Sequence, residues 1–307
     1  MIRTEETSTQ IVRRSVRVDG RQVSYLTVAD PTAEELILLI HGSGVSARYW
    51  TEQLLGLAKA LQVLALDLPG HGESDSIADS SVEAYADVVA GFLAVLGTGP
   101  VVVAGHSLGG AVGLALAVRR ERAVRGLVLL SSCAKVSRTN SWTENLLSYL
   151  PGPLRKILFF MAAKKMLFAP GASDLAVRLG MQELAACRPE TILQDLRAAK
   201  AMDLTEQARG LDVPVLIMCG SRDKVTPPAL SERLHGLIRR SRLDIVEGTG
   251  HMLLLEAPER VNRDILDFVG SLGAQREASL SRRFREIPMR SLLRRLLDRA
   301  RVLFRCG

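Results

Sequence analysis

The chain has 307 residues, of which 47% are hydrophobic and 24% are charged. This is enough apolar sequence for one large domain, and it argues against an intrinsically disordered protein. There is no run of about 18 apolar residues, so no membrane-spanning helix is expected, and the first thirty residues lack the apolar segment of a secretory signal. The four cysteines form no C-x-x-C pair, so we expect free thiols and a cytoplasmic protein.

The positive charge is concentrated at the end of the chain. The formal net charge is +7, and residues 273–307 alone contain ten Arg and three acidic residues, a balance of +7. The remainder has 30 basic and 30 acidic residues and is formally neutral. The excess of basic residues is therefore a property of the tail and does not indicate nucleic-acid binding by the main body.

Short apolar runs alternate with helical patterns along most of the chain. Most of these runs are continuous rather than alternating, which is typical of strands covered on both faces. Strand–helix alternation predicts an α/β fold with a mostly parallel central sheet flanked by helices. The predicted strands, in chain order, lie in QVSYLTVA, LILLIHG, VLALDLPGHGES, PVVVAGHS, RGLVLLSS, PVLIMCGSRD and RLDIVEGTGH.

The alternation stops between residues 133 and 210. This segment has helical periodicity and no convincing strand, and it is too long for a loop. We interpret it as a helical lid inserted over the carboxyl edge of the sheet. The predicted organisation is a first part of the core at 1–132, the lid at 133–210, a second part of the core at 211–272 and a basic amphipathic tail at 273–307.

The run ILFFMAAKKMLF supplies most of the apolar residues of the predicted lid. Ordinary packing on the sheet domain accounts for most of them, and any that face a cavity favour an apolar substrate. No cluster of Arg or Lys is evident for a substrate's anionic group, although Arg48 and Lys224 lie near the motifs described below. The apolar lid residues are Leu158, Phe159, Phe160, Met161, Met166, Leu167 and Phe168.

The stretch Gly105-His106-Ser107-Leu108-Gly109 has the pattern G-x-S-x-G between a predicted strand and a predicted helix. A serine on such a tight turn projects its hydroxyl clear of the sheet, and the flanking glycines relieve the crowding of the backbone. The helix that follows directs its N-terminal amides to the same place. Because the context fits as well as the pattern, a chance match is the weaker interpretation, and Ser107 is the candidate nucleophile.

A serine nucleophile needs a base and an acid that orients the base, and in this motif the acid and then the histidine follow the serine along the chain. His235 and His251 both lie well after Ser107. His235 falls in a helical pattern, whereas His251 lies in a glycine-rich loop after the last predicted strand. His251 is therefore the candidate base, and the alternative is a loop histidine that only binds backbone.

The candidate acid is Asp223, which follows the strand PVLIMCG. The position after the preceding strand reads LLSSCAKV and offers no carboxylate. The alternative role for Asp223 is that of a turn or helix cap, which is common for aspartate.

An acyl-transfer reaction also needs two donors for the oxyanion. One is expected to be the backbone amide of Leu108, next to the nucleophile, and the other to come from the loop after an earlier strand. His41-Gly42-Ser43-Gly44 fits this loop, with the amide of Ser43 favoured and that of Gly44 as the alternate.

The motifs HGSG, DLPGHGES, GHSLGG, GSRDKVTP and GTGHMLLLEAPERVN resemble the ordered motifs of the α/β-hydrolase superfamily. The resemblance covers roughly residues 23–272 and implies this fold with a Ser107–Asp223–His251 triad. The superfamily includes esterases, lipases, thioesterases, carbon–carbon bond hydrolases, cofactor-free haloperoxidases and hydroxynitrile lyases, so it does not specify the substrate. Haloalkane dehalogenases and epoxide hydrolases of the superfamily have Asp at the nucleophile position, and Ser107 argues against both activities.

The end of the tail, PMRSLLRRLLDRARVLFRCG, predicts an amphipathic helix that begins near Pro288. Its leucines and Phe304 share one face and its arginines the other. Three interpretations stay open: the helix packs on its own domain, docks on a partner, or lies on an anionic membrane surface. The third makes residues 275–307 a peripheral membrane contact, on the inner face of the membrane for a cytoplasmic protein.

The sequence thus predicts a serine hydrolase that cleaves an ester or thioester of an apolar acyl group. Ser107, Asp223 and His251 form the triad, and the amides of Ser43 and Leu108 bind the oxyanion. No cofactor is implied, and neither a metal-ligand spacing nor a phosphate loop is present. Two alternatives are a carbon–carbon bond hydrolase of diketone-type substrates and a non-catalytic binding or scaffold protein that works through its tail.

Overall fold

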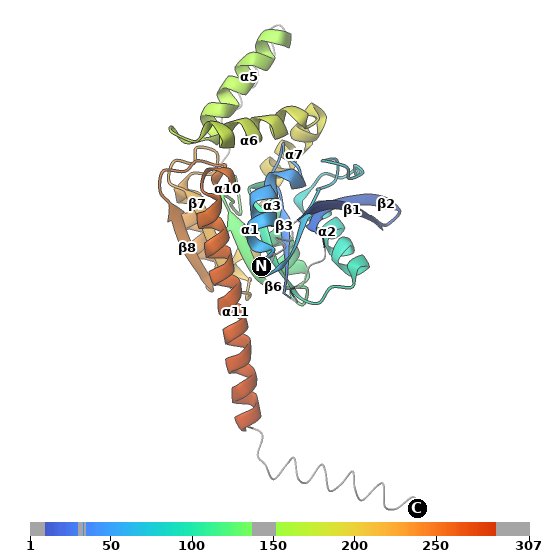
Figure 1. Ribbon diagram of the computed structural model, residues 1–307, viewed down its shortest axis with the longest axis vertical. Helices are drawn as coiled ribbons and strands as arrows, with labels where there is room; N and C mark the ends of the chain where they lie inside the picture. The colour runs from blue at the N-terminus through green and yellow to red at the C-terminus, as the bar shows by residue number, and fades with distance from the viewer. Residues whose placement is uncertain (1–9, 30–32, 34, 137–151, 287–307) are drawn as a thin grey trace, which may run out of the picture. The chain divides into compact units, whose positions relative to one another are not determined.

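The computed structural model describes residues 10–29, 33, 35–136 and 152–286, with side chains described from residue 157 to residue 274 in the last of these ranges. The chain divides into two compact units, Met1–Leu266 and Asp267–Gly307. The first unit contains an eight-stranded sheet (Figure 1). Of the second unit, the structure describes helix up to Glu286.

The strand order in the sheet is β1-β2-β4-β3-β5-β6-β7-β8. β1 pairs antiparallel with β2 and β2 with β4, and all later pairs are parallel. The mostly parallel α/β sheet expected from the sequence is therefore confirmed. The strands are β1 Ile11–Val18, β2 Arg21–Val28, β3 Leu36–Ile40, β4 Gln62–Leu66, β5 Val101–His106, β6 Val124–Leu130, β7 Val215–Gly220 and β8 Ser241–Val246.

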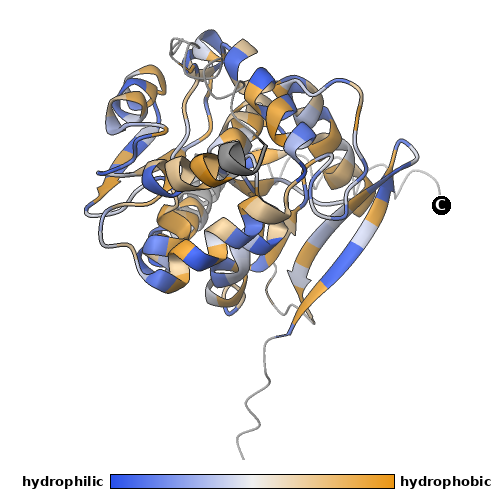
Figure 2. Ribbon diagram, turned by 90° about the horizontal axis from the view of Figure 1, so that it is seen from above, coloured by the Kyte–Doolittle hydropathy of each residue, from blue (hydrophilic) through white to orange (hydrophobic). Residues whose placement is uncertain are grey.

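Two strands inside the sheet, β5 and β7, are buried along their whole length. Every residue of β5 and of β7 is buried, which explains why their sequences are unbroken apolar runs. β1 is an edge strand that the apolar pattern did not predict, because Arg13, Arg14 and Arg17 interrupt it and most of its side chains are partly exposed. The alternation of hydrophilic and hydrophobic residues along the β1–β2 ribbon is visible at the right of Figure 2.

Helices connect the strands and cover the sheet. α2 packs on α3, α3 contacts β5, β6 and α8, and α8 contacts α9, while α1 contacts β4 and α10. Within the first unit, α3 thereby connects the centre of the sheet to helices from distant parts of the sequence. The helices are η1 Ala47–Trp50, α1 Thr51–Leu57, α2 Val82–Leu96, α3 Leu108–Arg119, α5 Gly152–Leu167, α6 Asp174–Ala186, α7 Pro189–Ala201, α8 Thr205–Arg209, α9 Pro228–Leu237, α10 Leu253–Glu256 and α11 Pro258–Glu286.

The ends of several helices follow local sequence signals. The hydroxyl of Ser81 accepts a hydrogen bond from the amide of Ala84 at the start of α2, and Gly97 ends that helix with a φ of 63°. The hydroxyl of Ser173 caps α6 in the same way, and α7 begins with Pro189. These are the residue types preferred at helix N-caps, left-handed C-caps and first turns.

Helices α5 to α8 lie between β6 and β7, inside the segment predicted as a lid. We call α5, α6 and α7 the cap. The model shows α6 and α7 over one end of the sheet (Figure 1), and the close approach of α6 to Gly44, which follows β3, identifies this end as the carboxyl edge. That these helices serve as a lid over the active site stays a prediction.

The apolar residues of α5 do not form a buried layer. The exposed fractions are 65% for Met161, 42% for Met166, 40% for Phe159 and 36% for Leu158, whereas Phe168, just after the helix, is buried. The expectation that most of this run packs into the interior is therefore wrong: among the described elements, α5 has several contacts with α6 alone.

No helix within the described ranges is both long and apolar enough to cross a membrane. Cys133, Cys187 and Cys219 are free thiols, as expected. Helix α11 continues past residue 272, the predicted end of the core. The amphipathic helix expected from Pro288 lies outside the described residues, so its three interpretations stay predictions.

A buried ion pair joins the cap to the core. Asp195, on α7, accepts hydrogen bonds from His71 Nε2 at 2.9 Å and from the Tyr85 hydroxyl at 2.9 Å. The side chains of His71 and Asp195 are both fully buried. Burial lowers the pKa of His71, but the hydrogen bond and charge of Asp195, with a further contribution from Cys187, outweigh it and raise that pKa to about 10. His71 is therefore charged at neutral pH.

Asp195→Ala is expected to lower the free energy of unfolding by about 3–5 kcal/mol, because it leaves a buried histidine charge without a partner. The folded-state pKa of His71, about 10, lies above its ordinary value of 6.5. Its contribution to stability is therefore full below pH 6.5 and is lost as the pH rises toward 10. Urea unfolding between pH 6 and pH 10 measures both effects, and the variant should lose this part of the pH dependence.

Asp203→Asn is the matched control. Asp203 also lies in the segment between β6 and β7 and pairs with Lys135, but both side chains are about half exposed. Exposed pairs contribute little to stability, so this variant should unfold close to the unmodified protein at every pH. Equal losses in the two variants would contradict the role assigned to the buried pair.

Candidate active site

Ser107 lies on a strained turn between β5 and α3. Its φ is 52° and its ψ is −118°, a conformation that costs a residue other than glycine roughly 1–3 kcal/mol. Backbone interactions hold it there: its amide donates to the carbonyl of Leu130 at 2.9 Å, and its carbonyl accepts from the Ser132 hydroxyl at 2.8 Å. The side chain of Ser107 is half-buried in this position.

The glycines around Ser107 are required by backbone contacts. A Cβ on Gly105 would overlap the carbonyl of Gly109, and a Cβ on Gly109 would overlap the carbonyls of Ile40 and His41. β3, β5 and the first turn of α3 therefore meet without side chains between them. This contact explains why glycines lie two residues before and two residues after Ser107 in the sequence.

The structure brings His251 and Asp223 together. His251 lies in the loop between β8 and α10, and its Nδ1 is 2.9 Å from Asp223 Oδ2. Both residues are buried. Because a carboxylate only accepts, Nδ1 carries the proton in this pair and Nε2 is left as the basic nitrogen. This is the tautomer that a general base of the serine-hydrolase type needs.

Asp223 is held by the turn that follows it. Its Oδ1 accepts from the amides of Val225 and Thr226 at 2.8 and 2.9 Å, and its Oδ2 accepts from the Thr226 hydroxyl at 2.9 Å. Burial raises the pKa of Asp223, but the hydrogen bond and charge of His251 and the Thr226 amide outweigh it and lower the pKa below its ordinary value. Asp223 is therefore a carboxylate at neutral pH, and it both caps the turn that follows it and binds His251.

The turn at Ser107 and the loop of His251 are neighbours. His106, directly before Ser107, lies 2.9 Å through its Nε2 from the carbonyl oxygen of His251. Across the described residues no direct hydrogen bond joins the Ser107 hydroxyl to His251. Such bonds are often long in unliganded enzymes and tighten when substrate binds. The pairing of Ser107 with His251 stays a prediction.

The loop after β3 lies against Ser107. A Cβ on Gly42 would be 3.0 Å from the Cβ of Ser107, and Gly44 has a φ of 75°. In the part of the chain that the structure describes, the amides of Ser43 and Leu108 donate to no protein acceptor. Both amides are available to donate to a negatively charged oxygen, and their role as the oxyanion donors stays a prediction.

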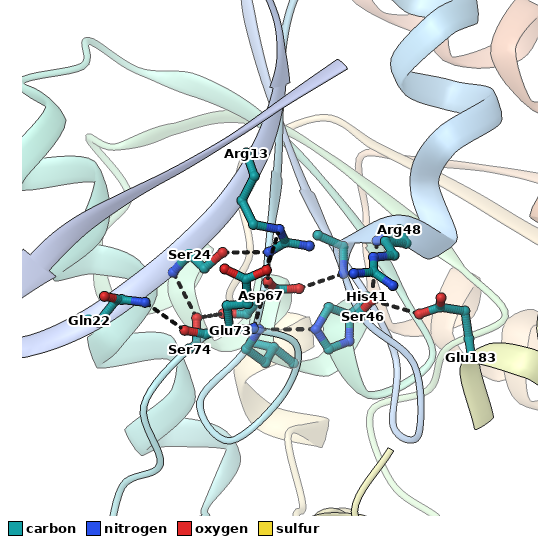
Figure 3. A network of polar contacts seen from close by, with 12 residues as sticks. Arg13, Gln22, Ser24, His41, Ser46, Arg48, Asp67, Glu73, Ser74 and Glu183 are labelled. Atoms are coloured by element: carbon teal, nitrogen blue, oxygen red, sulfur yellow. Dashed lines mark hydrogen bonds and ion pairs between the residues drawn. The ribbon is translucent and has the colours of Figure 1, made fainter. Parts of the chain in front are cut away.

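Buried polar groups anchor this loop, as Figure 3 shows. His41 Nδ1 donates to the Gly42 carbonyl at 2.7 Å, and its Nε2 accepts from the Leu68 amide at 3.0 Å. Burial and the nearby His71 lower the pKa of His41 to about 4, so it is neutral. Asp67 accepts from the Ala47 amide at 2.7 Å and pairs with Arg13. The loop is thus fixed at both ends.

Three further residues of this site do not stand out in the sequence. Thr226 binds both Asp223 and the backbone, and its only signal is its position three residues after the acid. His106 is the variable residue before the serine in G-x-S-x-G, and the motif itself assigns it no role. Glu256 accepts from the amide of Gly250 at 3.1 Å, and only a loop that folds back on its own helix brings these residues together.

A pocket of about 520 Å³ lies between the core and the cap, and its walls do not include Ser107, Asp223 or His251. Its walls come from the loop after β3, the turn after β4 and the end of α6, and it includes Ser46, Arg48, His71, Glu183 and Arg188. Glu183 accepts from the Ser46 hydroxyl at 2.6 Å. Among the residues that the structure describes, no group of three or more His, Cys, Asp or Glu residues could hold a metal ion.

Residues 37–264 match the model of the alpha/beta hydrolase family, which is more than half of the chain. The chain belongs to the alpha/beta hydrolase family. A pimeloyl-[acyl-carrier protein] methyl ester esterase of Neisseria meningitidis serogroup C is 34% identical over 248 residues, which are 78% of this chain and 95% of that protein. The resemblance suggested by the sequence motifs is thereby confirmed.

Solved structures of esterases and of a phospholipase are similar to this chain in fold. A thermophilic esterase from Thermogutta terrifontis has a TM-score of 0.73 and 25% identity over 86% of this chain and 99% of that one. A membrane phospholipase A has a TM-score of 0.72 and 27% identity over 85% of this chain and 86% of that one. With the esterase relatives, these matches show that the alpha/beta hydrolase described here is an ester-acting hydrolase.

Gly109→Ala is expected to disrupt the turn at Ser107, because the new methyl group would overlap two backbone carbonyls that belong to a central strand and its end. We expect a lower melting temperature and weaker labelling of Ser107 by a fluorophosphonate probe. Gly236→Ala is the control, since nothing lies within 4 Å of a Cβ at that helical glycine. If Gly109→Ala labels and melts like Gly236→Ala, the backbone contact does not shape the turn.

Proposed function

We propose that this chain is a serine hydrolase that cleaves an ester or thioester of an apolar acyl group through an acyl-enzyme. The observation that carries the proposal is the buried His251–Asp223 pair, 2.9 Å apart, beside a serine on a strained strand-to-helix turn. Its relatives include pimeloyl-[acyl-carrier protein] methyl ester esterases and putative carbamate hydrolases, and the esterases are the more similar, which favours ester cleavage over carbon–carbon bond cleavage and over a non-catalytic role.

The proposed reaction assigns a role to each of these residues. Ser107 Oγ attacks the carbonyl carbon while His251 Nε2 takes its proton, and Asp223 keeps the other ring nitrogen protonated and stabilises the charged ring. The carbonyl oxygen becomes an oxyanion that the amides of Ser43 and Leu108 bind. His251 then gives the proton to the departing alcohol or thiol. Water, activated by His251 in turn, attacks the acyl-enzyme and releases the acid and Ser107.

The apolar nature of the acyl group is inferred from the cap. A Cβ on Gly44, next to the Ser43 amide, would meet Leu184 on α6 and Ile192 on α7. An acyl chain whose carbonyl oxygen binds the Ser43 amide would therefore extend beside aliphatic side chains. The methyl ester named for the pimeloyl-[acyl-carrier protein] relatives supports an acyl ester with a small alcohol as one substrate to test.

Ser107→Ala and His251→Ala are each expected to lower kcat by roughly 10⁵- to 10⁶-fold, and Asp223→Asn by roughly 10⁴-fold, because the three residues act as a unit. Hydrolysis of p-nitrophenyl butyrate and labelling by a fluorophosphonate probe measure these losses. Asp212→Asn is the control, since Asp212 is largely exposed and pairs with Arg239 at the surface. An Asp223→Asn rate within a few-fold of the unmodified protein would reject Asp223 as the acid.

Ile192→Ala is expected to lower kcat/KM for p-nitrophenyl octanoate by about tenfold and to leave the acetate nearly unchanged, because lost aliphatic contacts affect only chains that reach the cap. Leu193→Ala is the control from the same helix, since Leu193 is 54% exposed. A loss in Ile192→Ala that is equal for all chain lengths would show that this side chain does not contact the acyl group.

A further inference from the structure

The candidate base, His251, and its two neighbours, Gly250 and Met252, each form a backbone hydrogen bond to a different part of the chain. The amide of Gly250 donates to the carboxylate of Glu256 on α10 at 3.1 Å. The carbonyl of His251 accepts from His106 Nε2, at the end of β5, at 2.9 Å. The amide of Met252 donates to the carbonyl of Leu167, at the end of α5, at 3.1 Å. The base therefore lies on a loop whose position other elements determine.

The bond from His106 is the one that reaches the base itself. A backbone carbonyl only accepts, so Nε2 of His106 must carry the proton that it donates. Burial and the nearby charge of His251 lower the pKa of His106 to about 3. The ring is therefore neutral across the working pH range, with one proton held between His106 and the His251 carbonyl. Its other nitrogen, Nδ1, is buried and has no partner among the described residues.

The ring of His106 also limits where the ring of His251 can lie. Its centroid is 4.9 Å from that of His251 and 5.0 Å from that of Tyr49. Tyr49 and His106 are both almost fully buried. A ring enclosed in this way cannot swing aside, so His106 holds His251 both through its carbonyl and through its imidazole.

We propose that His106 is a positioning residue: by donating to the carbonyl of His251 and packing against its ring, it sets the base at the distance from Ser107 that proton transfer requires. Glu256 assists by holding the preceding amide. The inference rests on the proposed function. Because His106 directly precedes Ser107, the same short segment places the nucleophile and the base, and any shift of β5 moves both together.

The test compares two amides at the same site. In His106→Gln the side-chain amide nitrogen takes nearly the place of Nε2 and can donate to the His251 carbonyl, whereas in His106→Asn the shorter side chain cannot reach it. His106→Asn is expected to lower kcat for p-nitrophenyl butyrate by about 10- to 100-fold with KM within twofold, because small misplacements of a base are that costly. His106→Gln is expected to keep kcat within about fivefold.

His235→Asn is the control, because His235 is an exposed helical histidine bonded to Ser241, and it should leave kcat unchanged. Circular dichroism and melting curves show whether each variant folds, and rates are compared per folded molecule. The proposal is overturned if His106→Asn retains the kcat of the unmodified protein, or if His106→Gln and His106→Asn lose kcat equally.

Glu256→Gln and Glu256→Ala form a second pair that remains informative if the His106 variants do not fold. Glu256 accepts from the amides of Gly250 and of Ala169, each at 3.1 Å. The glutamine keeps one acceptor oxygen and the alanine keeps none, so kcat should fall less in the first variant than in the second. Equal rates in both would reject positioning of the loop. Failure of the proposed function itself would appear in the unmodified protein, as absent ester hydrolysis and no Ser107 labelling.

Discussion

The site depends on the close contact of three backbone segments around Ser107. Gly105, Gly109 and Gly42 allow the end of β5, the start of α3 and the loop after β3 to approach without intervening Cβ atoms. Ser107 has a φ of 52° at this contact, and the amides of Leu108 and Ser43, within the described residues, donate to no protein acceptor. Sheet packing, and not a local preference of the serine, maintains the strained turn.

The histidines of this chain show how burial and partner decide the state of one side chain. His41 and His106 are neutral because burial lowers the pKa of each. The ring of each forms hydrogen bonds to backbone groups. His71 is charged because a buried carboxylate lies beside it. His251 binds Asp223 through Nδ1, which leaves Nε2 free for chemistry. The same residue type thus serves as backbone anchor, ion-pair partner and candidate base.

The cap is joined to the core at the residues that matter for the reaction. Leu184 and Ile192 approach Gly44 in the loop after β3, Asp195 binds His71 in the turn after β4, and Leu167 binds the loop of His251. The cap therefore also helps to hold these loops of the core in place. The cap thus contacts both the loop that carries Ser43 and the loop that carries His251.

The sequence by itself determined the central strands, the helical insertion and the candidates Ser107, Asp223 and His251, because apolar runs and a G-x-S-x-G turn are local signals. It did not predict β1, because the arginines of this edge strand interrupt its apolar pattern. It also predicted that the apolar residues of α5 are mostly in the interior, whereas Met161 and Phe159 are exposed. Only the tertiary structure decided that His251 Nδ1 binds Asp223, that Asp195 joins His71 and that His106 holds the His251 carbonyl. The members of each pair lie between 28 and 145 residues apart along the chain, and folding of the sheet is what brings them into contact.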